Sequence, residues 1–371
     1  MRIGINIIEA LPSNGGTWIV INNLLNAIAQ YDKHNEYVIY ATMGNKNIMP
    51  QFEKYEIVIC HCNNHNKFQR YLYINTILPF RIKSKKLDCM LWPFNTISFI
   101  NFVPSLVIIH DLAPITYPED FPSFFKRLFL QIALKMTINK AGVILAISKT
   151  TEKDIKAIKE IDNMKIMPNI IHDHFRILQK EKIEIFRAKY NLPEKFWLYV
   201  ANYYPNKNHL RLIMAYNELK TKNQQSFPLF FRGSGLEDNK EISQLIQEND
   251  LAQSIRFIPT LEFSEIALLY NAATALIFPS LFEGAGLPVM EAMACGCPVV
   301  ASDIPTTREF APDALLFNPN SIESMADAMD CFQKNECAIK EIFVKNTEMY
   351  TAKFRGKHII SILFEAYSHI C

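Results

Sequence analysis

The sequence predicts an α/β protein made of two Rossmann-like domains, each a doubly wound parallel sheet, which face each other across a cleft. Short runs rich in β-branched residues alternate with longer amphipathic runs, and this alternation is typical of parallel strands joined by helices. The alternation pauses at residues 165–175 and then restarts, which indicates two sets of similar size. A chain of 371 residues is long enough for two domains of ordinary size.

Five runs of the first half are expected to be strands and two are expected to be helices. The strands are expected at 3–8, 36–41, 56–60, 106–110 and 142–148, and the helices at 18–30 and 124–139. In the second half, the alternation continues at 196–201, 209–220, 227–233, 254–259, 273–280 and 298–303. We therefore expect a first domain at 1–170, a second at 183–345, and a last helix within 346–371 that packs back towards the first domain.

The composition is that of a folded chain without a nucleic-acid partner. Hydrophobic residues make up 49% of the sequence and the net charge is only +2. Residues 1–175 hold 19 basic and 14 acidic side chains, whereas the rest hold 20 and 23. A basic first half hints at an anionic surface or substrate near it. No signal-peptide pattern occurs, nor an apolar run of the roughly 20 residues that a spanning helix needs, so a cytoplasmic protein is expected.

The stretch FPSLFEGAGLPVMEAMACGCPVVASD, at 278–303, places two acids around a glycine-rich turn. Glu283 follows an expected strand, at the edge of the sheet where α/β proteins bind ligands. A helix is expected to begin at Pro288, which suits a first helical position, and to end at Gly296. Glu291 then lies about one turn into this helix.

Such a turn can hold a nucleotide diphosphate that is linked to a polyhydroxylated group. A helix start presents N–H groups and a positive dipole end to phosphate, and glycines let the backbone approach closely. A carboxylate accepts two hydrogen bonds, which suits the 2′ and 3′ hydroxyls of ribose, so Glu291 can hold the nucleotide while Glu283 faces the other end. Either acid alone is more often a solvated or helix-start residue, so the prediction depends on the combination. The backbone groups concerned belong to Gly284, Ala285, Gly286 and Leu287.

This stretch resembles the E-x7-E signature of retaining GT-B glycosyltransferases of family 4, the glycosyl transferases group 1. The likeness extends over nearly the whole chain. It implies that Glu291 binds the nucleotide ribose, and that Glu283, with the backbone after it, contacts the transferred sugar. Ala285 departs from the family pattern, which usually has Phe at this position.

Lys207, in the segment YVANYYPNKN, lies at an expected strand–helix junction where its charge can neutralise a diphosphate. A lysine at a helix start is more often simply exposed, but the resemblance implies a phosphate contact. Near Lys207 the chain departs from the family pattern at two positions: Ala201 replaces the usual Gly, and the usual nearby arginine is missing. Asn202 or Asn206 stands in those places, and Asn202 is expected to bind the donor. Arg232 or another residue is a candidate to compensate for the missing arginine.

Two further positions follow from the resemblance. Gly15 and Gly16 precede an expected helix; a lone Gly-Gly is by default an ordinary turn, but in the family such a loop faces the diphosphate and the acceptor. His110 lies at a strand end, and the pattern HDL…YPE is similar to a mannosyltransferase-like branch of the family. There the matching His lines the donor sugar, although a lone His at a strand end is more often structural.

The run 121–136 predicts a basic, amphipathic helix. Phe124, Phe125, Leu128, Ile132 and Met136 can share one face, and packing of that face on the core is the commoner outcome for such a pattern. The rival interpretation is docking on a membrane surface that carries a lipid-linked acceptor.

The sequence therefore predicts a retaining glycosyltransferase that moves a sugar from GDP-mannose or a UDP-sugar to a glycan or lipid-linked acceptor, in bacterial surface polysaccharide synthesis. His110, Glu283 and Lys207 are the expected catalytic residues, and no covalent nucleophile is assigned. No Asp-x-Asp triplet occurs, so we expect neither a metal nor another cofactor. We expect the enzyme in the cytoplasm, at the inner face of the membrane if the helix docks there. The alternatives are an epimerase or glucan-synthase-like enzyme of the same fold, or a catalytically silent scaffold.

Overall fold

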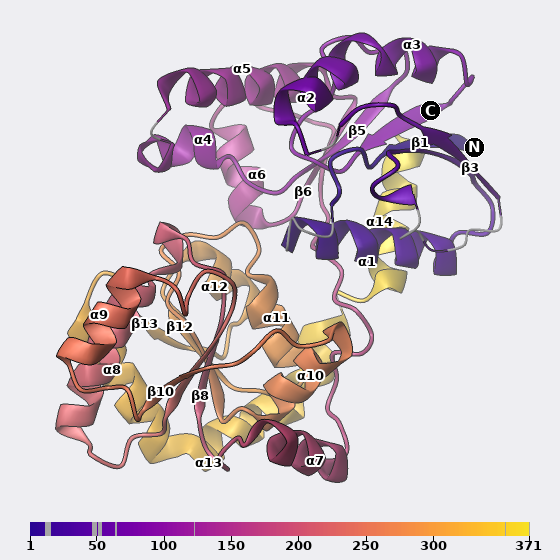
Figure 1. Ribbon diagram of the computed structural model, residues 1–371. Coiled ribbons are helices and arrows are strands. Elements are labelled where there is room, and N and C mark those ends of the chain that lie inside the picture. Colours follow the sequence, from indigo (N-terminus) through magenta and orange to yellow (C-terminus); the bar gives the residue numbers. More distant parts are fainter. Residues whose placement is uncertain are drawn as a thin grey trace. The chain divides into compact units, whose positions relative to one another are not determined.

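The chain folds into two compact units, each built on one parallel sheet (Figure 1). The computed structural model describes residues 1–11, 16–46, 50, 54–63, 65–121, 123–352 and 354–370. The first unit comprises Met1–Ile170 and Phe354–Cys371, and the second comprises Ile171–Lys353. The prediction of two parallel-sheet α/β domains is confirmed.

The sheet of the first unit has the strand order β3-β2-β1-β4-β5-β6-β7, and all its neighbouring strands are parallel. Strands β4, β5 and β6 are buried along their whole length, as expected where helices cover both faces of a parallel sheet. The strands are β1 (Arg2–Asn6), β2 (Glu36–Ala41), β3 (Tyr55–Ile59), β4 (Cys89–Trp92), β5 (Ser105–Ile109), β6 (Val143–Ala146) and β7 (Met164–Ile166).

Helices connect these strands, and side chains cap two of them. Asn66 accepts hydrogen bonds from two amides at the start of α2, and Ser148 accepts one at the start of α6. The helices are α1 (Gly16–Tyr31), α2 (Lys67–Thr76), α3 (Leu78–Lys83), α4 (Ala113–Thr116), α5 (Phe124–Lys140) and α6 (Lys149–Lys156), with a short 3₁₀ turn at Pro118–Asp120.

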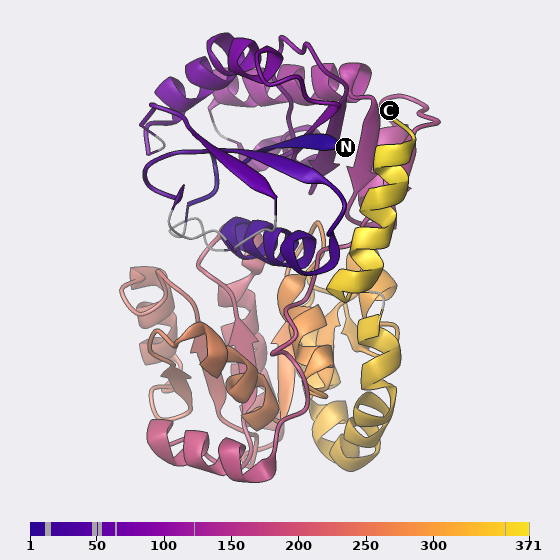
Figure 2. The same ribbon diagram turned by 90° about the vertical axis from the view of Figure 1, so that its right-hand side faces the viewer.

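The last helix, α14 (Gly356–Ser368), belongs to the first unit although it follows the second in sequence. It packs on α1, and Figure 2 shows the two helices side by side, α14 in yellow and α1 in indigo. A Cβ atom at Gly356 would lie 3.0 Å from the Ala27 Cβ and from the Tyr31 ring, so the glycine permits this close contact. Ile359, Ile360 and Leu363 of α14 are buried.

The sheet of the second unit has the order β10-β9-β8-β11-β12-β13, again with parallel neighbours. Its strands are β8 (Trp197–Val200), β9 (Leu229–Arg232), β10 (Ile255–Phe257), β11 (Ala275–Phe278), β12 (Val299–Ser302) and β13 (Leu315–Phe317). Its helices are α7 (Lys180–Tyr190), α8 (His209–Lys222), α9 (Lys240–Glu248), α10 (Phe263–Ala272), α11 (Leu287–Ala294), α12 (Pro305–Phe310) and α13 (Ile322–Ala352), with a 3₁₀ turn at Pro205–Lys207.

The strand order of this sheet reverses between β8 and β11. Strands β9 and β10 lie on one side of that point, and β12 and β13 lie on the other. Open α/β sheets bind ligands in the crevice at the carboxyl ends of the strands that flank such a reversal. The loops that follow β8 and β11 are therefore the first place to look for a site. Within the described residues, no helix combines the length and the apolar character needed to cross a membrane.

Candidate active site

The loop after β11 carries the predicted turn and ends in the left-handed conformation at Gly286. This residue is the N-cap of α11 and has φ +66°, a region that glycine adopts without strain. A Cβ atom there would also contact the ring of Phe278, at 3.5 Å. Pro288 occupies the first turn of α11. The glycine turn and the proline thus fix where the helix begins and where the backbone of 283–287 lies.

Two predicted catalytic side chains meet at the strand reversal. Lys207 ends the 3₁₀ turn after β8, Glu283 lies in the loop after β11, and their ammonium and carboxylate groups form a hydrogen-bonded ion pair. The side chains are 22% and 13% exposed, respectively, so the pair is largely withdrawn from water. Each charge in this structure is therefore neutralised by the other.

Hydrogen bonds join the two loops around this pair. The Leu281 amide donates to the Asn206 carbonyl at 2.8 Å, and the Thr306 hydroxyl donates to the Glu283 carbonyl at 2.7 Å. The Tyr199 hydroxyl, from β8, donates to the Lys207 carbonyl at 2.5 Å. The backbone on both sides of the ion pair is thus held by fixed contacts, which pre-positions the side chains.

Glu291 lies on α11 with only 8% of its surface exposed. The Tyr270 hydroxyl, from α10, donates to its Oε2 at 2.9 Å. Burial raises the pKa of Glu291 to about 7, while the Tyr270 hydrogen bond and the charge of Arg232 oppose that rise. No other described residue forms a hydrogen bond with its carboxylate, so one oxygen remains for a ligand. Sequence reasoning missed Tyr270, and a tyrosine in an amphipathic helix gave no signal of this contact.

Arg232 is the last residue of β9, next to β8, and so lies at the same edge of the sheet. Its Nε is buried and has no hydrogen-bond partner among the described residues. The following residue, Gly233, passes so close to the first loop that a Cβ atom would lie 1.9 Å from the Ala201 carbonyl oxygen. The Asn202 side chain accepts a hydrogen bond from the Ser234 amide at 2.9 Å, so it anchors this turn with its oxygen.

In the first unit, His110 immediately follows β5. Its Nε2 lies 2.8 Å from the Pro93 carbonyl oxygen, and its backbone amide donates to the Asn95 side chain at 2.6 Å. Burial lowers the pKa of His110, against the opposing effects of the Pro93 carbonyl and the charge of Asp111. A neutral ring that donates through Nε2 leaves Nδ1 as an acceptor. His110 can therefore accept a hydrogen bond from a hydroxyl group.

The predicted glycine loop is described only in part. Gly15 lies outside the described residues. Gly16 is the first residue of α1, and a Cβ atom there would meet nothing within 4 Å.

Comparisons with known proteins bear on these residues. The family model described as Glycosyl transferases group 1 matches residues 181–349, which include Lys207, Glu283 and Glu291. Residues 181–349 are therefore a glycosyl transferases group 1 domain. The O-antigen chain mannosyltransferase RfbU of Salmonella typhimurium is 27% identical over 265 residues, which is 71% of this chain and 68% of RfbU. The serotype-specific mannosyltransferase WbdA of Escherichia coli is 26% identical over 276 residues. The matched region is 72% of this chain but only 33% of WbdA.

This glycosyltransferase has the GT-B fold. It superposes on the Anabaena protein HepE, whose structure was solved in complex with UDP-glucose, with a TM-score of 0.77. The superposition covers 99% of both chains at 15% sequence identity. At this identity the likeness concerns the fold alone.

The helix that the sequence predicts at 121–136 is α5, and the face that it packs on the core is not the expected one. Helix α5 buries Ala133, Leu134, Thr137 and Ile138, whereas Phe124, Phe125, Leu128 and Ile132 are exposed. The expectation that this apolar face packs on the core is wrong for these four side chains, because another face of α5 makes that contact. Met136 of the predicted face does pack against the core.

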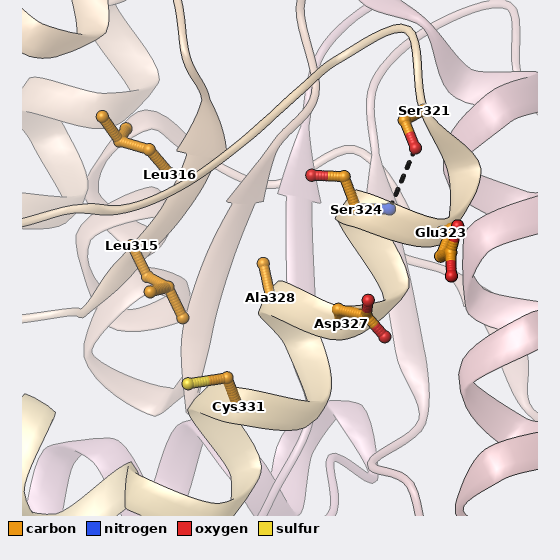
Figure 3. Close-up of a pocket in the computed structure, with 8 residues that line it drawn as sticks. All are labelled: Leu315, Leu316, Ser321, Glu323, Ser324, Asp327, Ala328 and Cys331. Atoms are coloured by element: carbon orange, nitrogen blue, oxygen red, sulfur yellow. Dashed lines mark hydrogen bonds between the residues drawn. The ribbon is translucent and has the colours of Figure 1, made fainter.

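A hollow of the second unit, shown in Figure 3, is lined by other residues. It has a volume of about 420 Å³ and lies between β13 and the start of α13. Asp327, on its rim, is paired with Lys222, and none of the predicted site residues lines it. Among the described residues, no group of three or more His, Cys, Asp or Glu side chains is placed to hold a metal ion.

Proposed function

We propose that the chain is a retaining glycosyltransferase, in the first place a mannosyltransferase, which transfers a sugar from a nucleotide-diphosphate donor without a metal or another cofactor. GDP-mannose is the first candidate donor and a UDP-sugar is the second. The acceptor is a glycan or lipid-linked oligosaccharide of a bacterial surface polysaccharide such as the O-antigen. The observation that carries the proposal is the Lys207–Glu283 pair in the loops after β8 and β11, the two strands at the reversal, followed in α11 by the buried Glu291.

The donor is assigned from the chemistry of these groups and from the relatives. Glu291 offers a carboxylate oxygen to the ribose hydroxyls, and Lys207 and Arg232 offer positive charge to the diphosphate. RfbU and WbdA are named as mannosyltransferases, which favours mannose. HepE was solved with UDP-glucose, which keeps a UDP-sugar as the second candidate.

In the proposed reaction, donor binding breaks the Lys207–Glu283 ion pair and gives each side chain a new partner. The diphosphate takes the Lys207 ammonium, and Glu283 is then free to accept hydrogen bonds from sugar hydroxyls. The bond from the anomeric carbon to the diphosphate breaks, and its electron pair leaves with the diphosphate. An acceptor hydroxyl forms the new bond on the same face of the sugar and gives its proton to the departing phosphate oxygen. Lys207 and the amides of 284–287 stabilise the growing negative charge.

His110 and the start of α1 are assigned to the sugar and acceptor side of the same reaction. His110 accepts a hydrogen bond from a sugar hydroxyl through Nδ1, and Gly15 and Gly16 line the diphosphate and acceptor. Asn202 contributes through its amide group, because its oxygen already anchors the turn at Ser234. The enzyme works at the inner face of the cytoplasmic membrane, where lipid-linked acceptors are reached, with the region 121–136 towards the lipid.

A thermal-shift screen over GDP, UDP, ADP and their sugars tests the donor assignment. A ligand at a hundredfold excess over Kd stabilises the folded protein by about 2.7 kcal/mol, which such a screen detects easily. We expect selective stabilisation by guanosine or uridine diphosphates, and release of the nucleoside diphosphate from the matching sugar donor. Absence of both would favour a silent scaffold, whereas an altered sugar without release of nucleoside diphosphate would favour an epimerase. Repeated addition of glucose to a growing chain would favour a glucan-synthase-like enzyme.

A further inference from the structure

A pocket of the second unit adjoins both loops of the candidate active site. It has a volume of about 410 Å³, and it is formed by the loop after β8, the first turns of α8, the start of α9 and the loop after β11. Pro205 and Leu281 line it, and they precede the two members of the ion pair, Lys207 and Glu283, by two residues each. The ion pair and Glu291 do not line it, so the pocket is separate from the groups assigned to the donor. We call it the tyrosine pocket.

Aromatic and apolar side chains form much of the wall of the tyrosine pocket. Tyr203 and Tyr204 line it from the loop after β8, and Met214 lines it from α8. Tyr204 is 59% exposed and Met214 is 41% exposed. Tyr203 is held at both ends, because its ring packs on the buried His209 with centroids 5.6 Å apart and its hydroxyl donates to Glu241 at 2.9 Å. The pocket thus presents a fixed aromatic ring beside an exposed one.

The charged groups of the tyrosine pocket are one cation and one anion. Arg211 donates from Nη1 to the Asn208 side-chain oxygen at 2.6 Å, and its guanidinium forms no other hydrogen bond with the described residues. In the same part of the chain, the Glu241 carboxylate accepts only from the Tyr203 hydroxyl. Burial lowers the pKa of His209 to about 4, so its ring adds no charge near neutral pH. The pocket therefore offers donors and an acceptor without a net charge.

A neutral saccharide matches this combination of groups. A sugar ring presents C–H groups on its faces, which pack on aromatic rings, and hydroxyls at its edge, which donate to a carboxylate and accept from a guanidinium. A phosphate or a nucleotide would favour an excess of cations. An alkyl chain would bury Arg211 and Glu241 without partners, which costs free energy. The volume also lies within the range of about 300–1,000 Å³ that is usual for pockets that hold small ligands.

We propose that the tyrosine pocket binds a sugar residue of the acceptor chain, at a distance from the end that receives the new sugar. Tyr203 and Tyr204 pack on the sugar ring, and Arg211 and Glu241 form hydrogen bonds with its hydroxyls. The inference rests on the proposed function, which supplies a glycan acceptor, and it narrows that acceptor to a chain of several sugars. A chain that occupies the tyrosine pocket and the active site together gains affinity, because the second contact forms within the same complex.

Saccharide binding to the full chain in the absence of a donor tests the pocket. Ligand-observed NMR titrations with mannotetraose, maltotetraose and chitotetraose supply three neutral probes, and we expect at least one of them to bind at millimolar concentration. Tyr204→Ala should weaken that binding about two- to tenfold, as expected for the loss of one aromatic contact. Arg211→Met should weaken it about tenfold, because it removes a charged donor and keeps the apolar stem.

The matched control is Tyr55→Ala, which removes a tyrosine of the first unit that is 40% exposed. It should bind the probe as the unaltered protein does, and thermal unfolding should show that all variants remain folded. With the bound tetrasaccharide as acceptor, Tyr204→Ala should raise KM by the same factor and leave kcat unchanged. With the methyl glycoside of the same sugar, which is too short to reach both places, neither constant should change.

Four results would overturn the proposal. The folded protein could bind none of the three probes, or Tyr204→Ala and Arg211→Met could bind the probe unchanged. Tyr204→Ala could weaken nucleoside diphosphate instead, which would place the nucleotide in the pocket, or it could raise KM equally for both acceptors. Because saccharide binding is measured without a donor, binding that Tyr204→Ala weakens in a protein that releases no nucleoside diphosphate would support the pocket and contradict the proposed reaction.

Discussion

Donor affinity should depend on pH through Glu291. Burial raises the pKa of this carboxyl group to about 7, so near pH 6 most of the ligand-free protein carries a proton there. Ribose hydroxyls donate to the ionised form, so binding must first remove that proton. With a pKa near 7, about one eleventh of the sites are ionised at pH 6 and about ten elevenths at pH 8. Affinity for the donor should therefore rise about tenfold across this interval, which corresponds to about 1.4 kcal/mol.

Isothermal calorimetry with an intact nucleotide-sugar at pH 6, 7 and 8 measures this dependence. The intact donor is preferable to the free diphosphate, whose terminal phosphate titrates in the same interval. Glu291→Gln should bind with little change over the interval, and its deficit relative to the unaltered protein should shrink as the pH falls. Tyr270→Phe should move the profile to higher pH, because the tyrosine hydrogen bond now lowers the pKa of Glu291. His209 does not interfere, since burial lowers its pKa to about 4.

Two results would refute this reasoning. Donor affinity that is constant between pH 6 and 8 in the unaltered protein would mean that Glu291 does not hold the ribose as an anion. The same tenfold rise in the folded Glu291→Gln variant would mean that another group titrates on binding.

Four further predictions concern the phosphate and sugar contacts and the need for a metal. Lys207→Ala should lower turnover about 10²–10³-fold and weaken ground-state binding of the donor less, because the charge of Lys207 acts most on the departing diphosphate. Steady-state rates measure the first effect and calorimetry the second. Equal losses in turnover and binding would contradict the assignment. Glu283→Gln should cut turnover of the donor while free nucleoside diphosphate binds at least as tightly as before, because Lys207 then has no carboxylate partner to give up; loss of diphosphate binding would place the nucleotide at that loop. Arg232→Gln should weaken nucleoside diphosphate about tenfold or more, as expected for a charged hydrogen bond. It should weaken the nucleoside less, through the higher pKa of Glu291 once the charge of Arg232 is gone; equal losses for both ligands would contradict a phosphate contact. Activity should also persist in excess EDTA, and full loss on chelation that Mn²⁺ restores would show that the phosphate site needs a metal.

Periodic features of the sequence predict the fold well. The run EYVIYA at 36–41 coincides with β2, and the run 196–201 contains β8. These strands are rich in β-branched and aromatic residues, and they are bounded by polar or turn-forming residues. The three strands that no run indicated, β4, β7 and β13, are only three or four residues long. Segments such as CMLW and LLF have little β-branching, and they become strands because a neighbouring strand supplies the hydrogen bonds.

In the candidate site, too, features that depend on local sequence could be predicted, and contacts between distant segments could not. The position of Glu283 and Lys207 in loops after strands follows from local signals, because strand ends and helix starts are marked by proline and glycine. Contacts between distant segments carry no such mark. The Tyr270–Glu291 hydrogen bond joins α10 to α11, and only the packing of these helices brings the two groups together. The exposed rings of α5 were misjudged for a related reason, since periodicity detects an apolar face but does not tell what covers it.

The Lys207–Glu283 pair links the resting structure to the proposed reaction. A largely buried charge without a partner costs several kcal/mol, so either side chain alone would be held poorly in this position. Each has a partner here, and each is offered a replacement when a donor arrives: phosphate oxygens for the ammonium, and sugar hydroxyls for the carboxylate. Both groups then remain satisfied before and after binding, and the loops that carry them, joined through Leu281, Asn206 and Thr306, need not rearrange. The bond between the sugar and the diphosphate would therefore break between the Lys207 ammonium and the Glu283 carboxylate, which are already in place. The ammonium then stabilises the departing diphosphate, and the carboxylate stabilises the positive charge that the sugar gains.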